Sequence, residues 1–247
     1  MLVKNLLRPA RPAASLLRLL LARQLGAVLR RNSAGAAPRG PRRGVVPAPG
    51  APVNLLVVGD STVNGAGIPE RRLTLGGQLA AALAARTGRA VNWAVLARGG
   101  VTPRQIVEKY AGRVARYEPD VIVVGLGANC MPQGHSTGDW GAALAEMLDE
   151  LRARAGDVPV VITAMPPVLR MKAVPQPLRT YWALRNRLFD AETKRLVRAR
   201  PSVVFGPPYV AGEQELLGPD GCHPSPEGYA LWGERLADTI APLLTER

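Results

Sequence analysis

A hydroxyl, an imidazole and a carboxylate stand in two short motifs of this sequence, and together they could carry out acyl transfer. Ser61 lies in "VVGDSTVNGAG", residues 57–67, and Asp220 and His223 lie in "PDGCHPSPEGY". A serine hydroxyl is a weak nucleophile at neutral pH, so it needs a neighbouring base whose tautomer a third group holds. We therefore expect Ser61 to be the nucleophile, His223 the base, and Asp220 the group that orients His223.

The spacing of Asp220 and His223 supports this pairing. Residues three apart lie on the same side of a helical turn, where the carboxylate can orient Nδ1 and leave Nε2 facing the serine. The only other histidine, His135, has Asp139 as its one acid at a matching short spacing. We expect His135 to face solvent or to lie in a substrate loop.

Acyl transfer also needs donors for the oxyanion of the tetrahedral intermediate, each worth on the order of 3 kcal/mol in a dry site. Asn129, in "GLGANC", could supply a side-chain amide, and Ser61 and Gly100 could supply backbone N–H groups. Gly100, in "RGGVT", has no Cβ and so allows a close approach of its backbone. We expect these three residues to form the oxyanion hole.

Other chemistries lack their motifs. The sequence contains neither GxxxxGK[ST] nor GxGxxG, and Val63 stands where a GxSxG motif needs its second glycine. CxxC and HExxH are absent, so we expect no metal site. Cys130 and Cys222 could form one disulfide at most, and each is most simply a small buried side chain.

Short apolar, β-branched segments precede most of these motifs and alternate with amphipathic stretches. That pattern predicts parallel strands with helical crossovers, covered on both faces. Ligands bind outside the carboxyl ends of such strands, so the candidate residues should meet at one edge of the sheet. The expected strands are 53–59, 90–97, 120–127, 159–165 and 202–206, and the expected helices are 73–87, 103–116, 139–155, 178–200 and 225–244.

The start of the chain differs in composition from the rest. Residues 1–50 hold ten of the 32 basic residues and none of the 19 acidic ones, so the remainder is close to neutral. Charge confined to one segment does not indicate a nucleic-acid surface. Residues 14–31 could form a helix, but Arg18 and Arg23 interrupt its apolar run, which argues against a membrane-spanning helix and a secretory signal.

This arm is open to three interpretations: a disordered tail, a basic helix on an anionic membrane surface through residues 1–31, or an organelle presequence. Residues 32–52 are typical of a linker. We therefore divide the chain into an arm, 1–52, and one folded domain, 53–247. We expect a cytoplasmic protein, peripheral on membranes if the arm binds them, while secretion stays open.

Three basic residues, Arg170, Lys172 and Arg179, flank the Pro-rich loop after the fourth expected strand. This loop should lie near the edge of the site. The three side chains either form a solvated basic loop or meet an anionic head group.

These motifs resemble those of the SGNH hydrolases, also called GDSL-type esterases and lipases. The four name-giving residues fall on Ser61, Gly100, Asn129 and His223, in the family's order, and the resemblance covers residues 53–245. Within the family, "PPVLRMKAVPQPLR" and "HPSPEGYALW" resemble the lysophospholipase-like bacterial esterases.

The resemblance implies an α/β fold, a flavodoxin-like three-layer α/β/α sandwich with a five-stranded parallel sheet. It also implies a serine acyl-enzyme mechanism, small-molecule or lipid ester (or thioester) substrates, and no cofactor. One departure is that Cys130 follows Asn129 where the family commonly has Asp. It should alter local hydrogen bonding more than chemistry. The alternative is a non-catalytic binding module on the same fold, attached to membranes by its basic arm.

Overall fold

A six-stranded sheet forms the centre of the molecule, in the order β1-β3-β2-β4-β5-β6. The computed structural model describes residues 16, 19–28, 36–130, 133–171, 173–209 and 216–245. Strands β2 to β6 run parallel, and β1 pairs with β3 in the antiparallel sense. The strands are β1 Arg43–Val46, β2 Gly50–Gly59, β3 Arg89–Ala97, β4 Val121–Gly125, β5 Val160–Thr163 and β6 Val203–Gly206.

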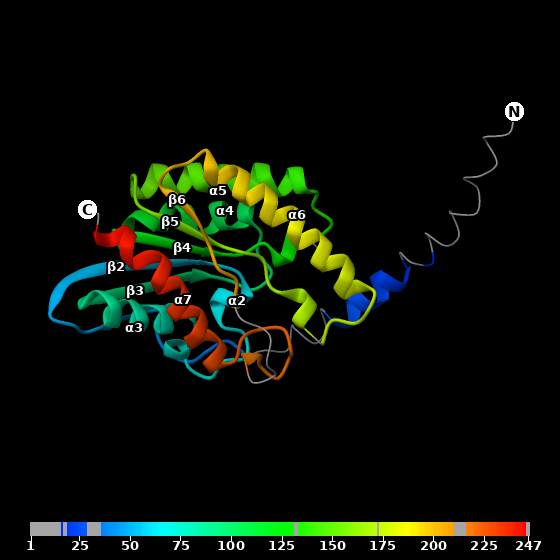
Figure 1. Ribbon diagram of the computed structural model, residues 1–247, viewed down its shortest axis with the longest axis horizontal. Coiled ribbons are helices and arrows are strands. Elements are labelled where there is room, and N and C mark those ends of the chain that lie inside the picture. The colour runs from blue at the N-terminus through cyan, green and yellow to red at the C-terminus, as the bar shows by residue number, and fades with distance from the viewer. Residues whose placement is uncertain are drawn as a thin grey trace, which may run out of the picture.

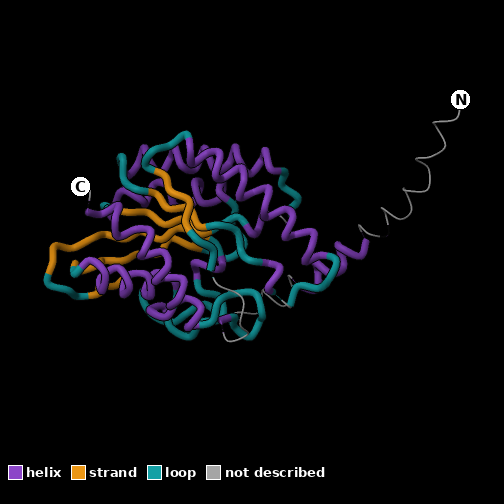
Figure 2. The backbone as a smooth tube through the Cα atoms, in the orientation of Figure 1, coloured by secondary structure: helices purple, strands orange, loops and turns teal. Residues whose placement is uncertain are grey.

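Helices cover both faces of this sheet, which makes three layers (Figure 1). Helices α3 and α7 pack on one face, and α4, α5 and most of α6 pack on the other. Figure 2 shows the strands as the middle layer, with loops at their ends. The helices are α2 Ser61–Asn64, α3 Leu75–Thr87, α4 Pro103–Val114, α5 Thr137–Ala155, α6 Leu178–Arg198 and α7 Pro226–Thr245, with short 3₁₀ helices η1 Arg71–Leu73, η2 Ala115–Tyr117, η3 Ala128–Cys130 and η4 Val168–Arg170.

Strand β2 explains why the expected strands are apolar nearly throughout. Its alternate side chains enter different cores: Leu55 and Val57 pack with α3 and α7, while Leu56 and Val58 pack with α4 and α5. All four are at most 2% exposed. A strand buried on both faces has no solvated side, so period-two alternation of polar residues is lost.

The predicted five-stranded parallel sheet is correct for β2 to β6 and misses β1. Strand β1 lies within residues 32–52, which we interpreted as a linker, and β2 begins at Gly50 instead of residue 53. A Cβ on Gly44 would come within 2.8 Å of the Trp93 ring, so glycine lets β1 cross the indole closely. Strand β1 has only four residues and is flanked by Pro and Gly, so its sequence alone does not predict a strand. It forms by pairing with the open edge of β3.

A helix over residues 19–28 packs against the rest of the molecule. Its partly buried Leu21 and Leu25 and its buried Val28 join the core that contains α3 and α7. Together with residue 16, this segment is the described part of the helix predicted for 14–31. Residues 1–15, 17–18, which include Arg18, and 29–35 lie outside the described residues. Within the described ranges, no helix combines the length and apolarity needed to cross a bilayer.

Candidate active site

Ser61 begins the one-turn helix α2 at the carboxyl end of β2. Asp60 caps this helix, because its Oδ1 accepts the N–H of Thr62 at 3.0 Å. Gly65 ends it in the left-handed region, with φ 77°, and donates its N–H to the Ser61 carbonyl. A Cβ on Gly59 would lie 2.1 Å from the Gly125 carbonyl oxygen, so glycine is needed where β2 passes β4. The polar cluster after the first expected strand therefore forms a tight strand-to-helix turn.

The side chain of His223 contacts both Ser61 and Asp220 at the carboxyl ends of the strands. Nε2 of His223 lies 2.9 Å from the Ser61 Oγ, although the two residues are 162 positions apart. Nδ1 of His223 lies 2.5 Å from Oδ2 of Asp220. His223 is 7% exposed, so the imidazole is largely shielded from water.

The Asp220–His223 spacing operates through a turn and not through a helix. Oδ1 of Asp220 accepts the backbone N–H groups of Cys222 and His223, each at 2.9 Å, and Gly221 takes a φ of 66°. Burial acts to raise the pKa of Asp220, but the hydrogen bonds from His223 and Cys222 outweigh it and hold that pKa below its usual value. The carboxylate therefore stays charged beside the imidazole.

The glycine pair after β3 lies against the serine. A Cβ on Gly99 would be 3.8 Å from the Cβ of Ser61, and Gly100 adopts a φ of 78°, which favours glycine. Among the described residues, no hydrogen bond occupies the N–H of Gly100. A donor at this position is therefore open to a ligand.

Asn129 reaches the same edge from the end of β4, but its amide already has partners. Its Nδ2 donates to Oδ2 of Asp60 at 3.1 Å and to the Val101 carbonyl at 3.3 Å. Asp60 thus joins helix α2 to the loop that carries Asn129. No spacing in the sequence signals the contact between Asp60 and Asn129, which are 69 positions apart.

Asp60 is only 2% exposed, and burial raises its pKa to about 6. Cys130, the departure from the family pattern, is also buried; burial, together with the nearby charge of Asp60, raises the pKa of its thiol to about 12. In the described parts of the chain, no disulfide joins Cys130 and Cys222. A thiol with so high a pKa stays protonated and is a poor nucleophile.

His135 belongs to a different local arrangement. Its backbone N–H donates to the Cys130 carbonyl, and its carbonyl accepts from Arg185. Asp139, the one acid at short spacing, instead accepts the Ser136 N–H at 2.8 Å in the capping box of α5. Within the part of the chain that the structure describes, His135 therefore has no orienting carboxylate of the kind that His223 has.

Arg71 was also missed by the sequence interpretation, because it lies in no motif. It is 4% exposed, and its Nη1 donates to the backbone carbonyl of Asn64 at 2.9 Å and to the Asn64 side chain at 3.3 Å. Its Nη2 donates to the Pro38 carbonyl at 3.3 Å. From the other side, the Tyr229 hydroxyl donates to the Thr62 carbonyl. These contacts hold α2 at both ends.

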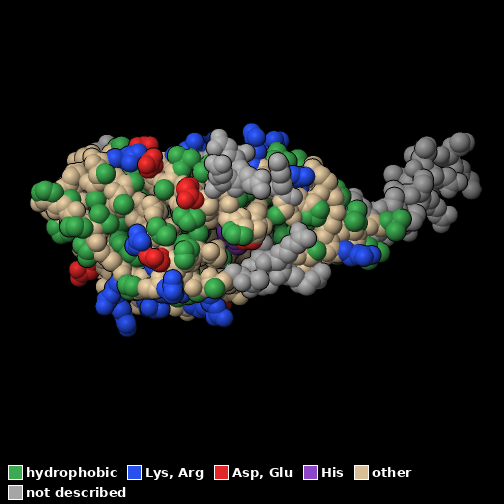
Figure 3. Space-filling view, turned by 90° about the horizontal axis from the view of Figure 1, so that it is seen from below, with side chains coloured by type: hydrophobic (Ala, Val, Ile, Leu, Met, Phe, Trp, Pro, Cys, Tyr) green, Lys and Arg blue, Asp and Glu red, His purple; other side chains and the backbone are tan. Residues whose placement is uncertain are grey.

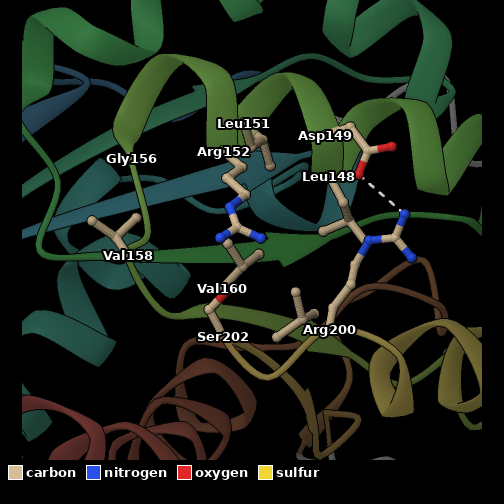
Figure 4. A pocket seen from close by; sticks show the side chains of 10 residues that line it. Leu148, Asp149, Leu151, Arg152, Gly156, Val158, Val160, Arg200 and Ser202 are labelled. Carbon is tan, nitrogen blue, oxygen red and sulfur yellow. Dashed lines mark hydrogen bonds and ion pairs between the residues drawn. The ribbon is translucent and has the colours of Figure 1, made fainter.

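A small cavity lies at the other end of the strands, away from Ser61 and His223. This cavity of about 30 Å³, near the amino ends of β5 and β6, is lined by apolar side chains with Arg152 and Arg200 at its rim (Figure 4). Arg200 pairs with Asp149 at 3.0 Å. Such a volume holds about one water molecule. In the described parts of the chain, no group of three or more His, Cys, Asp or Glu could hold a metal ion.

Comparison with known proteins finds one family. The model of the GDSL-like Lipase/Acylhydrolase family matches residues 57–231. The chain is 30% identical, over 203 residues, to the GDSL-like esterase Rv1075c of Mycobacterium tuberculosis; the match covers 79% of this chain and 64% of that esterase, less than two thirds of its length.

Solved structures share the fold at low sequence identity. The crystal structure of TesA has a TM-score of 0.62 at 21% identity, over 76% of this chain and 98% of that one. A family 3 carbohydrate esterase from Clostridium thermocellum has a TM-score of 0.63 at 17% identity, over 79% of this chain and 98% of that one. These similarities show the three-layer fold.

Proposed function

The chain belongs to the GDSL-like lipase/acylhydrolase family, and from this premise we propose that it hydrolyses carboxylic esters through an acyl-enzyme on Ser61. One observation carries the proposal: the Ser61 Oγ, the His223 ring and the Asp220 carboxylate form a continuous chain of contacts of 2.9 and 2.5 Å. A nucleophile within reach of a base that is itself oriented by a carboxylate is the arrangement that serine acyl transfer requires.

In the proposed mechanism, the Ser61 oxygen attacks the ester carbonyl while Nε2 of His223 takes the hydroxyl proton. The tetrahedral intermediate then collapses, and the imidazolium gives this proton to the departing alkoxide, which leaves as an alcohol. Water attacks the acyl-enzyme with His223 again as the base, so the acid is released and Ser61 regains its proton. Asp220 stabilises the imidazolium in both halves of the cycle.

The oxyanion would be held by the N–H groups of Ser61 and Gly100 and by the Asn129 amide. The Gly100 N–H has no hydrogen-bond acceptor among the described residues, which supports its part in this proposal. Asn129 can take part by exchanging its 3.3 Å hydrogen bond to the Val101 carbonyl for one to the substrate, while Asp60 keeps the amide in place.

The proposed substrates are small-molecule or lipid esters. Within this class, the lysophospholipase-like assignment rests on the sequence of the loop after β5, "PPVLRMKAVPQPLR". The relative from Mycobacterium tuberculosis is named an esterase, which supports the ester linkage and names no acyl group. Hydrolysis rates for p-nitrophenyl esters of increasing chain length would define the acyl preference.

Replacement of the nucleophile tests the proposal. We expect Ser61→Ala to lower the hydrolysis of p-nitrophenyl butyrate by roughly a thousandfold or more, since the attacking oxygen is lost. Ser202→Ala, at the opposite edge of the sheet, is the matched control and should keep full activity. Turnover retained by folded Ser61→Ala would remove Ser61 from the mechanism.

A fluorophosphonate probe distinguishes the enzyme from a non-catalytic module on the same fold. The natural protein should be labelled at Ser61, because the probe reacts with serines that a neighbouring base activates. The absence of labelling in folded protein would favour the binding module.

A further inference from the structure

Exposed large hydrophobic side chains gather at one end of the molecule. Among the described residues, eight such side chains are exposed, and seven of them lie on residues 16 and 19–28, on η4 and on the first half of α6. The eighth, Val45, lies on β1 at the far edge of the sheet. The seven are Leu16, Leu19, Leu20, Leu169, Tyr181, Leu184 and Leu188.

The three segments form one surface, which we call the docking surface: residues 16 and 19–28, 168–171 and 177–188. Gln24 joins the first segment to the start of α6, because its side chain donates to the Gln176 carbonyl and accepts the Leu178 N–H at 3.2 Å. Leu21 and Leu25 pack into the same cluster as Val168 and Leu178. On α6 the exposed positions 181, 184 and 188 share one face of the helix.

The docking surface carries one sign of charge. Residues 164–188 and the whole of 1–50 contain no Asp or Glu. Arg23, Arg170 and Arg187 are exposed beside the apolar side chains, and Arg179 is half-buried among them. Figure 3 shows hydrophobic and basic side chains together at this end of the molecule, whereas the acidic ones visible on that face lie elsewhere.

We propose that the docking surface binds an anionic phospholipid bilayer. Leucine side chains that project from a helix among arginines can enter the boundary between head groups and acyl chains, while the guanidinium groups stay at the level of the phosphates. Each basic residue near an anionic surface adds roughly 1 kcal/mol of attraction. The exposed leucines and the positive charge of the docking surface thus both favour an anionic bilayer.

The turn that carries Asp220 and His223 lies against Ala173, which stands in the sequence between two segments of the docking surface, 168–171 and 177–188. A Cβ on Gly221 would lie 2.8 Å from the Cβ of Ala173, which follows η4 in the chain. If the proposed function holds, a bilayer bound here brings the esters that it contains next to Ser61. The binding itself depends only on the surface and not on catalysis.

Cosedimentation of the full chain with vesicles tests this proposal. The protein should pellet with an equal mixture of phosphatidylcholine and phosphatidylglycerol at low salt, and less at high salt or with phosphatidylcholine alone. Leu184→Asp should lower the bound-to-free ratio by roughly tenfold, because a leucine is replaced by a charge of the wrong sign.

Val45→Asp is the matched control. This variant makes the same change in charge at another exposed hydrophobic residue, away from the docking surface. Val45 is 63% exposed, and Leu184 is 55% exposed. Val45→Asp should bind vesicles as the natural protein does. Failure of the natural protein to pellet, or equal binding by both variants, would overturn the proposal, since equal binding would assign the attraction to net charge alone.

Both variants should hydrolyse soluble p-nitrophenyl butyrate at the natural rate. This measurement keeps the two proposals apart. A protein that binds vesicles but does not hydrolyse esters would contradict the proposed function and support the docking surface. A protein that hydrolyses esters but does not bind vesicles would contradict the docking surface and support the proposed function.

Discussion

The charged carboxylate of Asp220 favours the His223 tautomer that carries its proton on Nδ1. Its Oδ2 can accept a hydrogen bond from Nδ1, so the neutral ring keeps its lone pair on Nε2, facing the Ser61 Oγ. Its other oxygen is held by the backbone N–H groups of residues 222 and 223. One carboxylate therefore shapes the turn and, in the proposed mechanism, orients the base.

Asp220→Asn separates these two roles. The Asn oxygen can still accept from the backbone, but its NH₂ group would face Nδ1 and force the proton onto Nε2. We expect kcat for p-nitrophenyl butyrate to fall by roughly a thousandfold or more with little change in unfolding free energy. Asp238→Asn, on exposed α7 surface, should leave both unchanged. Full activity of Asp220→Asn would contradict the assigned role.

Helix α2 is a single turn and cannot be stable without its surroundings, because the first turn of a helix fixes many dihedral angles for few hydrogen bonds. Asp60 caps its start, Gly65 ends it, and the buried guanidinium of Arg71 binds the carbonyl of its last residue, Asn64. The position of Ser61 is thus set by contacts from other elements.

Arg71→Met should disturb α2 without touching substrate. It leaves the carbonyls of Asn64 and Pro38 without donors, and we expect a loss on the order of 3 kcal/mol in unfolding free energy. In the proposed mechanism kcat should fall roughly tenfold or more while KM changes little, since the nucleophile is displaced. The neighbouring Arg72→Met, exposed and paired with Glu70, should change neither quantity. Equal effects of both variants would contradict this role.

The sheet as a whole extends beyond the predicted domain boundary at residue 53. Strand β1 covers the outer edge of β3, in the register that pairs Gly44 with Trp93 and Val45 with Asn92. An uncovered β3 would present a row of unpaired backbone groups and one side of a large indole. Residues of the predicted arm therefore belong to the sheet, while the predicted division of the chain has yet to be tested by truncation.

A chain that begins at residue 36 should be more stable than one that begins at residue 53. The shorter chain lacks β1 and the first residues of β2. Each hydrogen bond between β1 and β3 is worth roughly 1 kcal/mol, so their loss should lower the unfolding free energy of the shorter chain by about 3 kcal/mol. Urea unfolding of both chains, followed by tryptophan fluorescence, gives the comparison. Equal midpoints would show that residues 53–247 form the complete folding unit.

The sequence by itself determined the parallel core. Strands covered on both faces must be apolar nearly throughout, and glycines and polar residues mark their ends, so β2 to β6 and the five long helices lie within a few residues of their predicted bounds. The same local rule located Ser61, Gly100, Asn129 and the Asp220–His223 turn, because each follows a strand or a loop at one edge of such a sheet.

Only the tertiary structure shows the contacts between distant residues that no local sequence pattern predicts. Strand β1 forms because β3 has an open edge with which it can pair. The Arg71 guanidinium binds the carbonyl of Asn64, the last residue of α2. Asp60 binds Asn129, which is 69 positions away in the chain. The docking surface likewise depends on how the helix at 19–28 packs beside α6. Such contacts join residues far apart in the sequence, and which distant groups meet is set by packing rather than by periodicity.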